Sequence, residues 1–136
     1  MNKSRNNELI QLADTVLRKS SMYKDGQIPE TYNGKTAALS VSVAMSGLLP
    51  TLAMYFQDYD KKKPDNPWRR TILDVVAKMI DKPGNGPKFE GAEELLRHAV
   101  QNPDDLAYLK KEVIDCAIAL KQVIRTYKLV KNEKPA

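Results

Sequence analysis

The stretch YNGKTAALSVSVAMSGLLPTLAMYFQD, residues 32–58, decides the fold of this chain. It has no charged residue between Ala37 and Phe56, so we expect it to be hidden from water. A membrane, a central β-strand or the middle of a helical bundle could each hide such a segment. The rest of the sequence has to select one of these environments.

The local pattern favours two helices over a strand. Residues 39–46 alternate between apolar and small side chains, as a strand does, but no other alternating run exists in the chain to pair with them. The neighbouring residues are rich in Ala, Leu and Met, which favour helix. We predict a helix over about residues 30–46, apolar all round because it is fully buried. Ser46-Gly47 ends it, and Pro50 lies in the first turn of the next helix, which runs to Asp58.

A membrane span is the main alternative for this buried αα-hairpin of residues 30–58. Residues 37–56 have about the ~20-residue length that crosses a bilayer. The break at residues 47–50 interrupts the run, and serines and threonine dilute it. The other predicted helices are amphipathic and need an apolar surface to pack on, which the hairpin alone supplies. We therefore expect no membrane partner.

Helical periodicity predicts four more helices around the hairpin. The first covers about residues 6–20. Asn66-Pro67 is a start signal for the fourth, and a short fifth follows the turn at residues 82–87. The fourth helix is expected to turn its apolar positions toward the core, namely Ile72, Val75, Val76, Met79 and Ile80. The fifth holds Leu95, Leu96, Ala99 and Val100.

The last helix is predicted over about residues 103–131, with Asn102 as its cap and Pro103 at its first position. The expected fold is therefore all-α, with about six helices in a compact bundle around the hairpin. We expect one domain over residues 1–136, with short flexible ends at about residues 1–5 and 132–136.

Composition and charge limit the function. The hydrophobic content is 42% and the charged content 29%, as in ordinary globular proteins. A net charge of +5 indicates acidic partners, with nucleic acid first. One cysteine excludes an internal disulfide, and the N-terminus has no apolar run typical of a signal peptide. We expect a cytoplasmic protein.

Basic side chains gather on one side of the last predicted helix. At 100° per residue, four of them fall within about 60° of one another: Lys110, Lys121, Arg125 and Lys128. Ile114 and Ile118 lie on the same stripe, and large apolar side chains among lysines indicate a protein-docking surface.

Arg69 and Arg70 on the fourth helix are a second group that could contact phosphates. The other interpretation of both groups is a solvated basic surface that keeps the protein soluble. No recognition-helix motif is present, so we expect any nucleic-acid contact to reach the backbone and not the bases.

Residues for catalysis or metal binding do not assemble in this sequence. Gly34-Lys35-Thr36 resembles the end of a phosphate-binding loop, but Pro29 stands where that motif needs its first glycine. His98 and Cys116 are single, so one chain cannot build a His/Cys zinc site. We expect no enzyme activity, no metal and no cofactor.

The central residues resemble one known family. Tyr32-Asn33-Gly34 followed by SGLLPTLAMYF at residues 46–56 is similar to the small subunit of type III-B CRISPR effector complexes, the Cmr complexes. There, a buried helix ends at a Ser-Gly-Leu or Asn-Gly-Leu step before a second helix. The similarity extends over about residues 8–130.

This resemblance implies an all-helical, non-catalytic subunit. Its partners would be other subunits of the effector complex, further copies of itself stacked head to tail, and guide and target RNA. The family's basic residues are not a strict motif, so the RNA contacts assigned above still rest on the helical wheel. A helical protein–protein adaptor, whose charge serves solubility, stays open as the alternative function.

Overall fold

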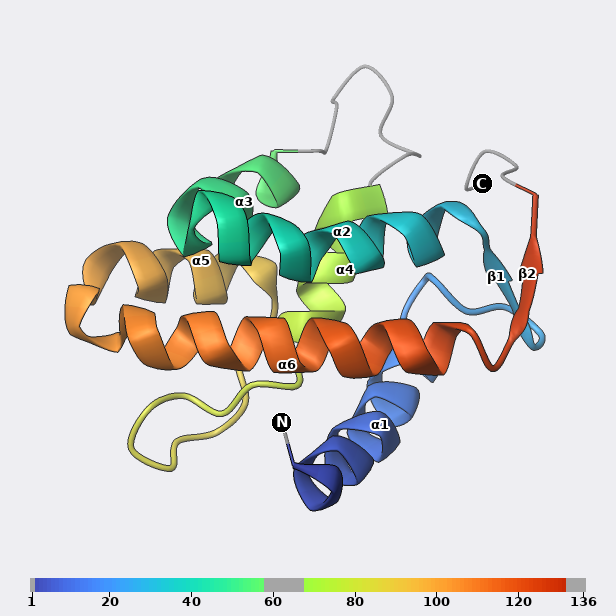
Figure 1. Cartoon of the computed structure of the whole chain (residues 1–136), viewed down its shortest axis with the longest axis horizontal. Coiled ribbons are helices and arrows are strands. Elements are labelled where there is room, and N and C mark those ends of the chain that lie inside the picture. The colour runs from blue at the N-terminus through green and yellow to red at the C-terminus, as the bar shows by residue number, and fades with distance from the viewer. Residues whose placement is uncertain (1, 58–67, 132–136) are drawn as a thin grey trace.

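The computed structural model describes residues 2–57 and 68–131, and these confirm the all-α fold class (Figure 1). They form six α-helices, one 3-10 turn and one short two-stranded sheet. No helix in these two ranges is long and apolar enough to cross a membrane. The elements are α1 Lys3–Arg18, β1 Gln27–Pro29, α2 Thr31–Ser46, α3 Leu48–Phe56, α4 Trp68–Ala77, α5 Ala92–Gln101, η1 Pro103–Asp105, α6 Leu106–Ile124 and β2 Lys128–Val130.

The predicted hairpin of α2 and α3 is confirmed. Gly47 joins the two helices with φ 94°, a backbone conformation that glycine adopts without strain. Pro50 lies in the first turn of α3, as expected. A side-chain hydrogen bond also joins the two helices, in which Tyr55 Oη donates to the Lys35 carbonyl at 2.7 Å. The predicted end at Asp58 lies outside the described residues, and α3 itself ends at Phe56.

The expectation that the hairpin is fully buried is wrong for α2. One stripe of this helix faces the core and is buried, namely Tyr32, Thr36, Leu39 and Val43. The opposite side faces solvent, where Val41 is 55% and Met45 82% exposed. The reason is geometric: α2 packs on α6 at the outside of the bundle, so only one side of it has a neighbour among the described elements (Figure 1).

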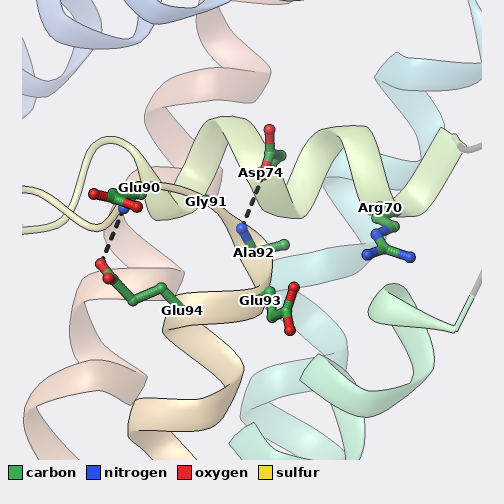
Figure 2. Close-up of a pocket in the computed structure, with 7 residues that line it drawn as sticks. All are labelled: Arg70, Asp74, Glu90, Gly91, Ala92, Glu93 and Glu94. Carbon is green, nitrogen blue, oxygen red and sulfur yellow. Dashed lines mark hydrogen bonds between the residues drawn. The ribbon is translucent and has the colours of Figure 1, made fainter.

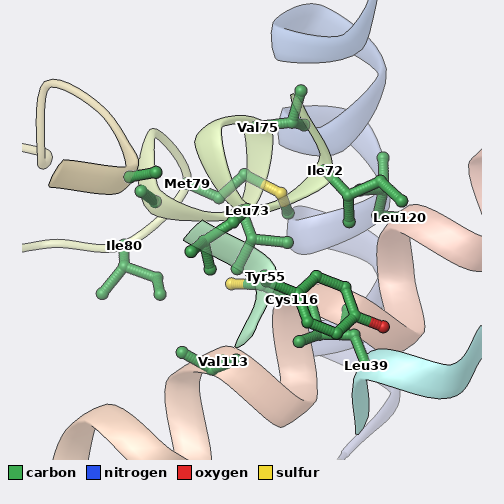
Figure 3. Close-up of a cluster of buried hydrophobic side chains, with 14 of the residues drawn as sticks. Leu39, Tyr55, Ile72, Leu73, Val75, Met79, Ile80, Val113, Cys116 and Leu120 are labelled. Carbon is green, nitrogen blue, oxygen red and sulfur yellow. The ribbon is translucent and has the colours of Figure 1, made fainter. Parts of the chain in front are cut away.

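The helix α6 runs through the centre of the packing. It contacts α2 on one side and α1 on another, and α4 also packs against it. In Figure 3, side chains from α2, α3, α4 and α6 meet in one cluster, in which Tyr55 lies beside Leu39 and Cys116, and Ile72 lies beside Leu120. Each such buried aliphatic side chain contributes about 1.5–3 kcal/mol relative to exposure.

The C-terminal end of α6 differs from the prediction. The helix ends at Ile124, and residues 128–130, expected to be helical, form β2. This strand pairs in parallel with β1, in register Ile28 with Leu129. The Glu30 N–H donates to the Val130 carbonyl at 2.8 Å, so pairing with β1 supplies the backbone bond that a longer helix would have made.

Two smaller predictions also change. Helix α1 begins at Lys3, so residues 3–5 belong to a helix and not to a loose end. Asn102 does not cap the last helix: its backbone and side-chain amides both donate to the His98 carbonyl and so end α5. The start signal at residues 66–67 and the C-terminal end at 132–136 lie outside the described part of the chain.

Candidate nucleic-acid interface

The outer side of α6 carries a row of cations. Lys110 and Arg125 are exposed and Lys121 is half-exposed, and the two end residues are fifteen positions apart, about 22 Å along the helix. Lys111, which we did not predict, is also exposed and lies about 40° from Arg125 on the wheel. The same wheel could have found it, because its angle places it at the edge of the stripe.

These cations lack carboxylate partners within the described part of the chain. Among residues 2–57 and 68–131, none of the ion pairs involves Lys110, Lys111, Lys121 or Arg125. Lysines elsewhere in the same ranges do have partners: Lys78 with Asp74 at 3.2 Å, Lys82 with Glu94 at 2.9 Å and Lys88 with Asp81 at 2.9 Å. The positive charge of the α6 row is therefore not cancelled by these neighbours.

The acidic residues of α6 point to another side. Arg5 of α1 pairs with Glu112 and, at 3.2 Å from Nε, with Asp115, which is buried (7% exposed). Burial lowers the pKa of Arg5, but these two carboxylates raise it more, so the net pKa lies above its ordinary value. An arginine from α1 thus neutralises the acids of α6 away from the cation row.

Basic residues continue past the C-terminal end of α6, where Lys128 lies on the strand β2. The Arg125 Nε donates to Asn33 Oδ1 at 3.3 Å, which joins the C-terminal end of α6 to the first turn of α2. Lys128 is exposed, but it lies on β2 and not on the predicted helix. Its place on the helical wheel was therefore wrong, although its side chain still faces solvent just beyond α6.

The two isoleucines of the stripe are less available than predicted. Ile114 and Ile118 are both partly buried, and Ile114 packs against the core. Neither belongs to the large apolar side chains that are mainly exposed. The docking surface predicted there is reduced to the outer parts of these two side chains.

Arg69 and Arg70 lie on a different surface. The Arg69 guanidinium is 5.8 Å from the centre of the Tyr55 ring, and that of Arg70 is 4.0 Å from the Phe56 ring. Arg70 also lines a pocket of about 530 Å³ between α4 and the start of α5, whose other charged side chains are acidic (Figure 2). The structure does not bring these arginines together with the α6 row. The remaining pocket residues are Asp74, Glu90, Gly91, Ala92, Glu93 and Glu94.

The acids of this pocket serve the N-terminus of α5. Asp74 Oδ1 accepts a hydrogen bond from the Ala92 N–H at 2.9 Å, and Glu94 Oε1 accepts one from the Glu90 N–H at 3.1 Å. The pKa of Glu94 is lowered by its bonds to Lys82 and to the Glu90 backbone. These carboxylates satisfy backbone donors at a helix start, and their negative charge repels phosphates.

Groups suited to catalysis are held in structural contacts. His98 Nε2 lies 2.8 Å from Asp105 Oδ2, which links α5 to η1, and its ring packs edge-on against Phe89. Burial raises the pKa of Cys116 to about 12, so its thiol stays protonated. The two described ranges contain no group of three or more side chains that could hold a metal ion.

Comparisons with known proteins agree with this fold. The sequence model of the CRISPR-associated Cas_Cmr5 proteins matches residues 3–127. The X-ray crystal structure of a CRISPR-associated Cmr5 family protein from Thermus thermophilus matches with a TM-score of 0.65 and 19% identity, over 94% of this chain and 99% of that chain. At this identity the structural match shows the fold alone. A comparison with curated proteins found no significant match.

The family match covers all six helices of the described structure, including the α2–α3 hairpin and the whole of α6. The resemblance seen in residues 32–56 is therefore confirmed over nearly the whole chain. This chain belongs to the Cmr5 family of CRISPR-associated proteins, the small subunits of type III-B Cmr effector complexes.

Proposed function

We propose that this chain is a non-catalytic structural subunit of a Cmr ribonucleoprotein, whose α6 row contacts guide or target RNA. Several copies stack beside the backbone filament, and the outer parts of Ile114 and Ile118 meet a neighbouring copy. One observation carries the RNA contact: the cations of α6 have no carboxylate partners in the described residues, while Arg5 neutralises the acids of the same helix.

The expected contact is with phosphates. A rigid helix that presents Lys110, Lys111, Lys121 and Arg125 along about 22 Å can follow an RNA strand and release its counterions. Arg125 is held by Asn33, which positions its guanidinium beside α2. Such binding is independent of sequence and falls steeply with salt, by about 0.7 in log K per log salt for each phosphate neutralised on a single strand.

Neutral variants of the row test this contact. We expect Lys121→Gln with Arg125→Gln to reduce the salt slope for a fluorescent oligouridine by about 1.4, at two phosphates lost. The assay is fluorescence anisotropy of the full chain at a series of KCl concentrations, repeated on the reconstituted Cmr assembly, with circular dichroism to confirm the helix content.

The matched control is Lys78→Gln with Lys88→Gln, which removes the same charge from lysines that already have acidic partners. We expect this control to change the slope little. If the two double variants lose RNA binding equally, net charge and not the α6 row is responsible. An unchanged slope in the first variant would remove the row from RNA binding altogether.

A protein–protein adaptor is the second candidate, favoured by the exposed apolar side of α2, where Met45 is 82% exposed. It predicts that the other Cmr subunits retain this chain in high salt and after nuclease treatment, even when Lys121 and Arg125 are neutral. Loss of the chain under those conditions would indicate that RNA, and not direct protein contact, holds it in the complex.

A further inference from the structure

Asn33 and Gly34 form an Asn-Gly pair in the first turn of α2, beside the C-terminal end of α6. Gly34 is exposed, and a Cβ added to it would meet nothing within 4 Å among the described residues. Its φ is not in the positive range, so the described part of the chain does not require glycine there. The pair is chemically reactive, because asparagine is thermolabile and glycine has no side chain to shield its amide nitrogen.

The reaction open to this pair is deamidation. The Gly34 backbone nitrogen attacks Asn33 Cγ and closes a succinimide ring, and the side-chain nitrogen leaves as ammonia with the Gly34 amide proton. Water then opens the ring. Cleavage of the Cγ–N bond leaves an aspartate at position 33, whereas cleavage at the other ring carbonyl leaves an isoaspartate. Water is the only co-reactant, so the step needs no cofactor.

The attack requires the first turn of α2 to open, because a helical backbone turns the Gly34 nitrogen away from the Asn33 side chain. This turn is weakly held at its start: Glu30, at the N-cap, makes no side-chain hydrogen bond to the helix. Gly34 lowers helix stability in the same turn. Helix ends open locally without unfolding of the whole domain. The reaction is therefore accessible to the folded protein.

A partner for the product is already in place. The Arg125 Nε donates to Asn33 Oδ1 at 3.3 Å, and this neutral amide holds the guanidinium without cancelling its charge. An aspartate has nearly the same shape as asparagine, so its carboxylate would meet the same guanidinium as an ion pair. The first turn of α2 contains no acidic residue, and the helix dipole favours a negative charge there.

We propose that Asn33 is a deamidation site, and that the aspartate formed there pairs with Arg125 and withdraws this cation from the α6 row. The second half of this inference rests on the proposed RNA contact, and the first half does not. The new carboxylate also repels phosphates at the C-terminal end of the row. The change is slow and not reversed by the protein itself, so it weakens RNA binding as the protein ages.

Peptide mapping by mass spectrometry tests the site, because conversion of an amide to an acid changes the peptide mass. The full chain is incubated at mildly alkaline pH, either folded or in guanidinium chloride, and trypsin separates residue 33 from the second Asn-Gly pair at 85–86. We expect Asn33 to convert about 10 to 100 times more slowly in the folded chain. Slowing by more than about 1,000-fold would show that only global unfolding exposes Asn33, and would overturn the site.

The control for the chemistry is Gly34→Ala, whose methyl group hinders the attacking nitrogen. We expect conversion of Asn33 to fall at least about tenfold in the unfolded variant. An unchanged rate would show direct hydrolysis of the side-chain amide and would overturn the succinimide route.

Asn33→Asp reproduces the side chain of the product and tests the RNA consequence. In the anisotropy assay with oligouridine, we expect this variant and Arg125→Gln each to reduce the salt slope by about 0.7, at one phosphate lost. The double variant should lose no more than either single one, because both act through Arg125. The matched control is Asn7→Asp, the same change at an exposed position of α1, which should leave the slope nearly unchanged.

These variants separate the inference from the proposed function. If Arg125→Gln lowers the slope and Asn33→Asp does not, the withdrawal of Arg125 is wrong and the RNA contact stands. If neither lowers it, the contact of Arg125 with RNA is wrong, and the RNA consequence of deamidation falls with it. Equal losses in Asn33→Asp and Asn7→Asp would assign the effect to net charge and overturn the pairing with Arg125.

Discussion

Arg5 is expected to hold α1 on α6, and its replacement by methionine tests this clamp. The change keeps the aliphatic stem but leaves Glu112 and Asp115 without their cation. Breaking a fully buried ion pair costs about 3–5 kcal/mol. Because the Arg5 side chain is 32% exposed and solvent screens the pair, we expect about 2 kcal/mol here.

This loss converts into a measurable shift of the melting temperature. At about 2.1 cal/mol/K per residue, the unfolding entropy of a 136-residue chain is about 0.29 kcal/mol/K, so about 2 kcal/mol lowers Tm by about 7 °C. The assay is thermal and urea unfolding followed by far-ultraviolet circular dichroism. The matched control is Arg97→Met, an exposed arginine on α5, which should change stability by less than about 0.5 kcal/mol.

A double-mutant cycle with Asp115→Asn separates the pair from general effects of Arg5. We expect a coupling energy of about 1–2 kcal/mol, so the double variant should be less destabilised than the sum of the single changes. Strictly additive effects, or a Tm for Arg5→Met equal to that of Arg97→Met, would refute the idea that this clamp stabilises the fold.

Two further predictions concern glycine positions and the single thiol. Gly91→Ala should lower the free energy of unfolding by about 1 kcal/mol, because a Cβ there would collide with Asp74 Oδ1 and displace it from the Ala92 N–H. Gly34→Ala has open space around it and should raise the free energy of unfolding by about 0.5–1 kcal/mol. Urea unfolding of both variants checks the opposite signs, and an unchanged stability of Gly91→Ala would contradict the close contact with Asp74. Cys116 should react with Ellman's reagent at mildly alkaline pH only as fast as the protein unfolds. A pKa of about 12 leaves on the order of one thiol in 10,000 ionised near pH 8. Labelling within seconds under native conditions would contradict the burial of this thiol.

The elements predicted best are those with local signals. The α2–α3 hairpin follows from Gly47 and Pro50, which act on the backbone of their own turn and need no distant partner. The packing side of α6 also follows a local spacing, because its buried residues recur every third or fourth position, as Leu109, Val113, Cys116 and Leu120 do.

The candidate site was predicted only in part, since charges interact across the fold. The wheel placed Lys110, Lys121 and Arg125 on one side of a helix, and that side is indeed accessible. It could not show that Arg5, more than a hundred residues away in the sequence, forms ion pairs with the acidic residues of α6. Nor could it show that Arg70 shares a pocket with carboxylates of α4 and of the start of α5.

Periodicity and turn residues alone were enough to establish a helical protein with a central hairpin and a long last helix, because these features depend on neighbours three or four positions apart. Only the packed chain decided where α6 ends, since Lys128–Val130 gains its hydrogen bonds from β1, about a hundred residues earlier. The packed chain also decided which side of the apolar helix α2 is buried. An all-round apolar helix has no preferred side until α6 covers one of them, and that leaves Val41 and Met45 facing water.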